Sequence, residues 1–226
     1  MKDALRIILV LTIFISLVMT TGCATQKTAH SGFLENYPVF EKGPKGGVDF
    51  VFLKKDVDFS SYNKVMMDHV VFYFSEDAKY KGIHADELKE LADTFHKAFA
   101  EALANAYPLV DKPGLGVLRI RTAITDLVPS KPGLSGVTTV IPIGLAIDIV
   151  KSGAGGGHTG VGQASIEVEF LDSMTNERIA VAVDTKPGGK LQGLTKWGAA
   201  KGAFEFWAKR LRTWLDQIHG KNQDPN

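Results

Sequence analysis

Cysteine, net charge and long apolar runs are all scarce in this chain of 226 residues, and each absence excludes a class of protein. Its single Cys allows neither an intramolecular disulfide nor a metal site with several thiolates. Its 26 Lys and Arg balance 25 Asp and Glu, so no basic excess favours nucleic acid. No apolar run reaches the ~20 residues of a membrane-spanning helix. What remains is an average composition, typical of one globular domain with an ample core.

Residues 1–22 have the pattern of a secretory signal peptide. A short basic start precedes a mostly apolar run, residues 7–19, which has the length of a signal-peptide core. Small residues then lead directly to Cys23. This segment resembles a bacterial lipoprotein signal, which implies that the Cys23 thiol is acylated, with palmitate among the acyl groups. A plain secretory signal and an uncleaved anchor stay open as alternatives.

The mature chain is expected to be held on a membrane by these acyl chains, each buried methylene contributing ~0.8 kcal/mol. Ala24 follows the Cys where an Asp would favour the inner membrane. By resemblance to this sorting rule, the protein is predicted to sit in the outer membrane. Without residues 1–22 the chain is neutral, so the lipid, and no basic patch, provides the attachment.

The mature chain divides into a tether, one domain and a short tail. Residues 23–47 are polar and rich in Pro and Gly, which is typical of a tether. Within it, residues 31–40 are more apolar and are predicted to dock on the domain. Residues 48–220 are predicted to form a single α/β sandwich domain, and 221–226 a polar tail.

Hydrophobic periodicity predicts an α+β fold. Strand patterns occupy residues 64–74, 116–128, 164–172 and 178–185. Apolar residues at three- and four-residue steps predict long amphipathic helices near 88–106 and 194–218. Because each helix has one apolar face, we expect a two-layer α/β sandwich: a mostly antiparallel sheet of about four strands, covered by both helices.

The segment 137–162 does not fit these patterns. An apolar stretch interrupted by Pro142 and Gly144 leads into the glycine-rich SGAGGGHTGVG. It is interpreted either as a buried element with a flexible loop or as an element of self-association or membrane contact. A dinucleotide loop is disfavoured, because a strand pattern follows the glycines where that fingerprint requires a helix.

No catalytic constellation is found, so we expect no enzyme, no metal and no cofactor. The six His are scattered and do not pair at metal-ligand spacing. Candidates for contact with a partner or ligand are His158, in the glycine-rich loop, and Trp214, the Trp most exposed by the helical pattern. Glu167 and Glu169 are expected on a solvent-facing side of their strand. Basic residues of the second helix, Arg210 among them, are expected on its solvated face.

Several sequence blocks together resemble one bacterial lipoprotein family. These are SGFLENY, GVLRIRTAITDLVPSKP, IEVEFLDSMTNERIAVAVDTKPGGK and WGAAKGAFEFWAKRLRTWLD. The family they resemble, over about residues 31–216, is domain of unknown function 3313. The resemblance implies a Gram-negative lipoprotein that faces the periplasm, and it supplies no catalytic residues.

Two functions are therefore expected. The first is an outer-membrane-anchored, periplasm-facing module of envelope interaction or structure, which binds an unknown envelope protein or itself through 137–162. The alternative is a lipid- or glycan-binding lipoprotein of the cell envelope, with Trp214 and the basic helix face as its contacts.

Overall fold

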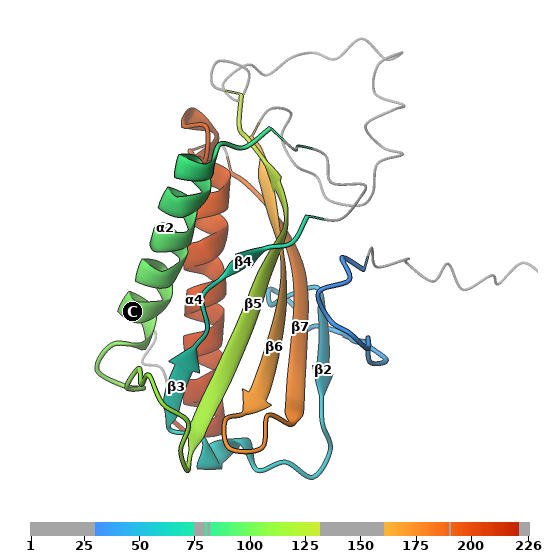
Figure 1. The fold of residues 1–226 in the computed structure, drawn as a ribbon, viewed down its shortest axis with the longest axis vertical. Helices are drawn as coiled ribbons and strands as arrows, with labels where there is room; N and C mark the ends of the chain where they lie inside the picture. Colours follow the sequence, from blue (N-terminus) through green and yellow to red (C-terminus); the bar gives the residue numbers. More distant parts are fainter. Residues whose placement is uncertain (1–29, 75–79, 81, 132–160, 190, 222–226) are drawn as a thin grey trace, which may run out of the picture.

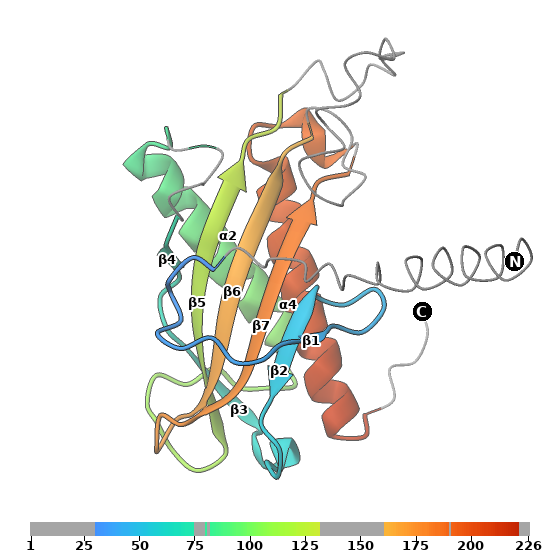
Figure 2. The same ribbon diagram turned by 90° about the vertical axis from the view of Figure 1, so that its right-hand side faces the viewer.

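The structure is a computed structural model that describes residues 30–74, 80, 82–131, 161–189 and 191–221. Within these ranges, two long helices lie on one face of a seven-stranded sheet, and an N-terminal segment crosses the other face (Figures 1 and 2). The mixed α/β class and the two covering helices are confirmed.

Three long antiparallel strands form the centre of the sheet: β5 (Val117–Val128), β6 (Gln163–Asp172) and β7 (Arg178–Pro187). The short strands at its edges are β1 (Glu41–Lys42), β2 (Phe50–Leu53), β3 (Lys64–Met67) and β4 (Val71–Phe72). The strand order is β1-β2-β7-β6-β5-β3, and β4 also pairs with β5. All pairs are antiparallel except those that β3 and β4 make with β5.

The prediction of about four strands was wrong, because the sheet has seven. The predicted strand 64–74 is divided between β3 and β4, since Val70 N–H turns away and donates to His96 Nε2 at 3.2 Å. β1 and β2 have only two and four residues, too few to leave an alternating pattern in the sequence. β1 lies within the range 23–47 assigned to the tether, so chain before residue 48 contributes to the sheet.

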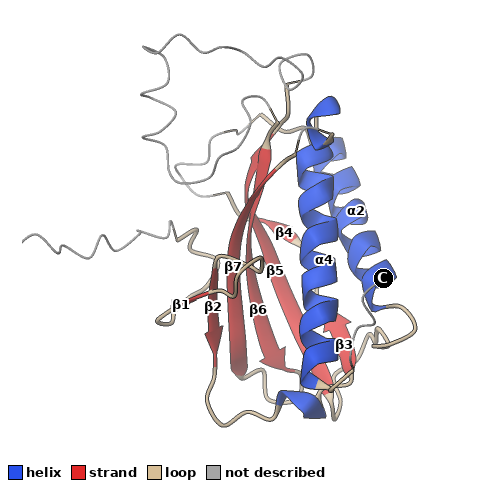
Figure 3. Ribbon diagram, turned by 180° about the vertical axis from the view of Figure 1, so that it is seen from behind, coloured by secondary structure: helices blue, strands red, loops and turns tan. Residues whose placement is uncertain are grey.

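The two helices, α2 (Ala85–Leu103) and α4 (Gly198–Ile218), lie side by side over the sheet (Figure 3). Their contact is aromatic: the Phe95 ring stacks on Phe99 at 4.4 Å and meets the edge of Phe204 at 5.4 Å. α4 begins later than residue 194, because a short 3-10 turn, Gln192–Leu194, precedes it and leaves Leu194 62% exposed.

Residues 31–40, which we call the strap, cross the face of the sheet opposite the helices (Figure 2). Leu34 is only 2% exposed. Ser31 N–H and the Tyr37 hydroxyl both donate to the Glu167 carboxylate, at 3.0 and 2.9 Å. Glu167 itself is buried, which satisfies the rule that a buried carboxylate needs donors.

The second glutamate of this face forms the other half of the network. Glu169 is 4% exposed and is paired with Arg121 at 2.7 Å and Arg178 at 2.6 Å. Arg178 also donates to the Asn36 carbonyl oxygen of the strap. The expectation that Glu167 and Glu169 face solvent was therefore wrong: the alternation is real, but the strap covers the side that it predicts to be wet.

Candidate functional site

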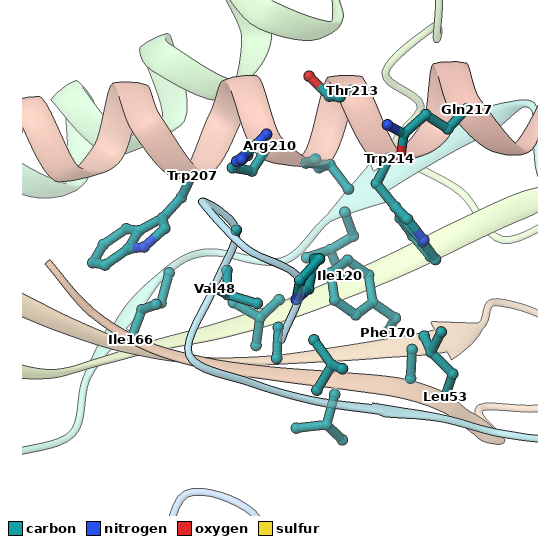
Figure 4. Close-up of a pocket in the computed structure, with 18 of the residues that line it drawn as sticks. Val48, Leu53, Ile120, Ile166, Phe170, Trp207, Arg210, Thr213, Trp214 and Gln217 are labelled. Carbon is teal, nitrogen blue, oxygen red and sulfur yellow. The ribbon is translucent and has the colours of Figure 1, made fainter. Parts of the chain in front are cut away.

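An apolar cavity of about 330 Å³ lies between α4 and the sheet, where β2, β7 and β6 meet (Figure 4). This volume is within the ~300–1,000 Å³ range of small-molecule sites. Its lining is mainly aliphatic and aromatic, with a few polar side chains from α4 and the 44–48 loop. The lining residues are Pro44, Lys45, Gly47, Val48, Val51, Leu53, Phe99, Ile120, Ile166, Val168, Phe170, Ala180, Val181, Ala182, Trp207, Arg210, Leu211, Thr213, Trp214 and Gln217.

The cavity exists because β7 carries small side chains under α4. Strand register places Ala180 opposite Phe170 and Ala182 opposite Val168. Side chains of paired residues point to the same face of a sheet, so the two alanines lie beneath the helix beside larger neighbours. An alanine fills less of the space between helix and sheet than Ile166, Val168 and Phe170 of β6, and the cavity is the volume left over.

Two tryptophans, two helical turns apart on α4, stand at opposite ends of the cavity (Figure 4). Trp207 Nε1 donates to Asp184 Oδ2 at 2.6 Å. Burial raises the pKa of Asp184, while that hydrogen bond opposes the rise. The Trp214 ring packs at 5.4 Å from Phe59 and 5.5 Å from Phe170. These contacts fix both indoles as rigid walls.

The mouth of the cavity is covered by the loop of residues 43–49. Gly43 N–H bonds the Asp49 carbonyl at 2.8 Å, which closes the loop. Asp49 N–H donates to Asp184 Oδ1 at 2.8 Å. From the helix side, Arg210 Nη2 donates to the Gly46 carbonyl, and Gly46 has a φ of +73°, a conformation that favours glycine. The loop is thus held to both walls of the cavity.

Of the contact residues predicted from the sequence, the structure describes only some. Cys23 and His158 lie outside the described residues, as does 137–162 apart from its last two positions, so those predictions stay predictions. Trp214 is half-buried and lines the cavity, where the helical pattern placed it toward solvent. Arg210, expected on the solvated face, also lines the cavity.

Sequence reasoning missed Trp207, Asp184 and the two alanines as a site. The one signal for it was the alternation of the segment RIAVAVDT, in which small residues recur on the face that meets α4. Within the described part of the chain, no group of three or more His, Cys, Asp or Glu is placed to hold a metal ion. Nor does any helix there combine the length and hydropathy needed to span a membrane.

The fold and the site define a class: an α+β sandwich with one strapped sheet face and an apolar cavity under its second helix. The chain belongs to the family described as protein of unknown function (DUF3313), whose model matches residues 29–211. The resemblance to this family is therefore confirmed.

The chain is similar in sequence to curated lipoproteins and, at much lower identity, in structure to solved proteins. The chain is 27% identical over 180 residues to the uncharacterized lipoprotein YdcL of Escherichia coli K12, which covers 77% of this chain and 80% of that protein. The same protein of E. coli O157:H7 matches equally. The name supports the prediction of a lipoprotein, and its source is consistent with a Gram-negative envelope.

Among solved structures, a PelC dodecamer from Paraburkholderia phytofirmans is 9% identical, with a TM-score of 0.38 over 71% of this chain and 95% of that one. The hypothetical protein CT253 from Chlamydia trachomatis is 10% identical, with a TM-score of 0.35 over 69% of this chain and 99% of that one. Likenesses of this size carry no argument about what this chain binds.

Proposed function

We propose that the protein is a lipid-anchored lipoprotein of the outer membrane, facing the periplasm, whose domain binds the apolar chain of a lipid in the cavity under α4. The cavity carries this proposal. It extends between Trp207 and Trp214 and is lined mainly by hydrocarbon. Burial of a hydrocarbon chain there contributes ~0.8 kcal/mol per methylene.

Two observations favour a lipid chain over a glycan. Sugars stack on a flat, open indole face, whereas Trp214 is half-buried, with the rings of Phe59 and Phe170 packed against it. The cavity floor, formed by β2, β6 and β7, supplies methyl groups rather than hydrogen-bond partners. A glycan would leave its hydroxyls unpaired against that floor, which costs free energy.

The position of the strap keeps the cavity near a source of lipid. The strap holds the chain to the sheet from Ser31 onward, only eight residues after Cys23. Even fully extended, residues 23–30 span about 25 Å. A domain anchored at Cys23 therefore stays within reach of the membrane surface.

Binding is tested with residues 24–226, expressed without the acyl anchor, so that no detergent competes for the apolar cavity. The ligand is dodecanol with bromine near its methyl end, because bromine quenches indole fluorescence on contact. We expect saturable quenching of Trp207 and Trp214, which line the cavity. Ala182→Leu, which projects into the cavity and narrows it, should weaken this quenching, and Ala92→Leu on α2, outside the lining, should not. Unsaturable quenching, or equal quenching in both variants, would refute lipid binding.

The anchor is tested separately in cells. Cys23→Ser should prevent incorporation of a labelled palmitate analogue, while the unchanged chain should be labelled and band with the outer membrane on a sucrose gradient. Labelling that survives Cys23→Ser would contradict the assignment of this residue. Banding with the inner membrane would contradict the predicted location.

A further inference from the structure

Basic side chains gather around the mouth of the cavity, and the described residues form no ion pair with them. Arg210 donates one hydrogen bond, from Nη2 to the Gly46 carbonyl oxygen. Its Nε is buried and has no hydrogen-bond partner among the described residues. A guanidinium has five N–H donors in a planar fork, so this side chain retains capacity to bind an anion.

Two lysines lie near Arg210, one in the lining of the cavity and one on a ring that Arg210 also contacts. Lys186 Nζ lies 3.7 Å from the centroid of the Phe206 ring, and Arg210 Cζ lies 5.6 Å from the same ring. Lys45 lines the cavity and directly precedes Gly46, the residue that Arg210 binds. We call Lys45, Lys186 and Arg210 the cationic rim.

Within the described ranges of the chain, no acidic side chain forms a close ion pair with the rim, although Asp184 lies near enough to Lys186 for their charges to interact. None of the nine ion pairs found there includes Lys45, Lys186 or Arg210. The Asp184 carboxylate already accepts hydrogen bonds from Trp207 Nε1 and from Asp49 N–H. Like charges held together repel one another, so a bound anion would relieve the repulsion at the rim.

We propose that the ligand of the cavity is a single-chain amphiphile with an anionic head group, a carboxylate or a phosphate ester. This inference rests on the proposed function and names its ligand class. The hydrocarbon chain lies between α4 and β7, and the head group binds Arg210 and Lys45 at the mouth. A volume of about 330 Å³ is near the lower end of ligand sites, which suits one chain rather than two.

The test compares three ligands that share one brominated twelve-carbon chain: laurate, dodecyl phosphate and dodecanol. Charge-assisted hydrogen bonds at a half-buried site predict that the anions bind about tenfold more tightly than dodecanol, a difference of about 1.4 kcal/mol. Arg210→Gln should bring the anions to within about twofold of dodecanol, whose affinity is measured in the same variant as the reference. Lys209→Gln, at the adjacent exposed position, should keep the full preference.

Each outcome is decisive. A tighter fit for laurate or for dodecyl phosphate supports the proposal and identifies the head group. Equal affinity for all three ligands overturns it but leaves lipid binding standing, whereas binding of none defeats the proposed function itself. Because Arg210→Gln removes a contact to the loop, its fold is checked by thermal unfolding. Lys45→Gln, on the loop itself, is the second variant and should lower the preference about threefold; an unchanged preference in both variants overturns the rim.

Discussion

Adding apolar atoms to the cavity should stabilise the protein while it weakens ligand binding, and Ala182→Leu is the change that tests this. Ala182 lies on the cavity floor, with Val168 and Val51 as its neighbours across the strands. A leucine there projects its added carbons toward α4 without displacing another side chain. In a protein whose interior is already close-packed, the same substitution would instead be harmful.

The magnitude follows from three added carbons. Complete burial would contribute about 2.4 kcal/mol, at ~0.8 kcal/mol for each. Loss of leucine rotamer freedom costs about 0.5–1 kcal/mol. The neighbouring Leu53 is 49% exposed, so the cavity is open at that end and burial is incomplete. We therefore expect a net gain of about 1 kcal/mol in the free energy of unfolding, which raises Tm by about 2–4 °C in a chain of this size.

Urea unfolding measures this gain against a matched substitution. Ala203, on α4, is 1% exposed and does not line the cavity. Ala203→Leu should therefore overpack the core and cost about 1–3 kcal/mol. If Ala182→Leu is as destabilising as Ala203→Leu, the space under α4 does not exist and the reasoning that leads to lipid binding fails.

Three further predictions concern the strap and two titrating side chains. Tyr37→Phe removes a hydrogen-bond donor to the buried Glu167 carboxylate, which should cost the strap about 1.5–3 kcal/mol of local stability. Amide hydrogen exchange in the strap should therefore accelerate about tenfold or more, with exchange in β6 unaffected. Unchanged protection of the strap would contradict the role of this bond. The hydrogen bond from Lys196 lowers the pKa of Glu87 to about 2. The contribution of ionised Glu87 to the free energy of unfolding is therefore present above pH 4.5 and is lost as pH falls toward 2. In urea unfolding, the stability of Glu87→Gln should depend less on pH over this acid range. Burial, and then a hydrogen bond to a neighbouring aspartate, raises the pKa of Tyr62 to about 12. The stability that the neutral phenol contributes below pH 10 should therefore be lost between pH 10 and 12. Tyr62→Phe should lessen this alkaline loss, and an unchanged dependence of the free energy of unfolding on pH would contradict the role of Tyr62.

The long elements of the fold could be predicted because many residues carry each pattern. The observed strands β5, β6 and β7 begin and end within two residues of the predicted 116–128, 164–172 and 178–185. The strap is different, because its partners are remote. Ser31 and Glu167 are 136 positions apart, and no local periodicity reports a contact at that distance.

The cavity could not be predicted because it depends on volume rather than on polarity. Ala180 and Ala182 count as apolar in an alternating pattern, just as valines would, so the pattern predicts a core and says nothing of how full it is. Arg210 is basic and lies on a helix with other basic residues, a pattern that predicts a solvated face. Its contact with Gly46 depends on a loop that lies 164 positions earlier in the chain.

The strap also determines how a chain anchored at Cys23 would respond to mechanical force. Because it runs across the strands, its attachments to Glu167 and Arg178 lie one after another along the line of pull. A peeling force would break them in turn, well before the shared ladder of β5, β6 and β7 yields. The ten released residues would span at most about 35 Å when extended, and the reach of the domain would increase by the difference between that length and the distance that the strap already covers. Under force the strap would thus detach first and lengthen the tether, while the sheet and helices stay folded.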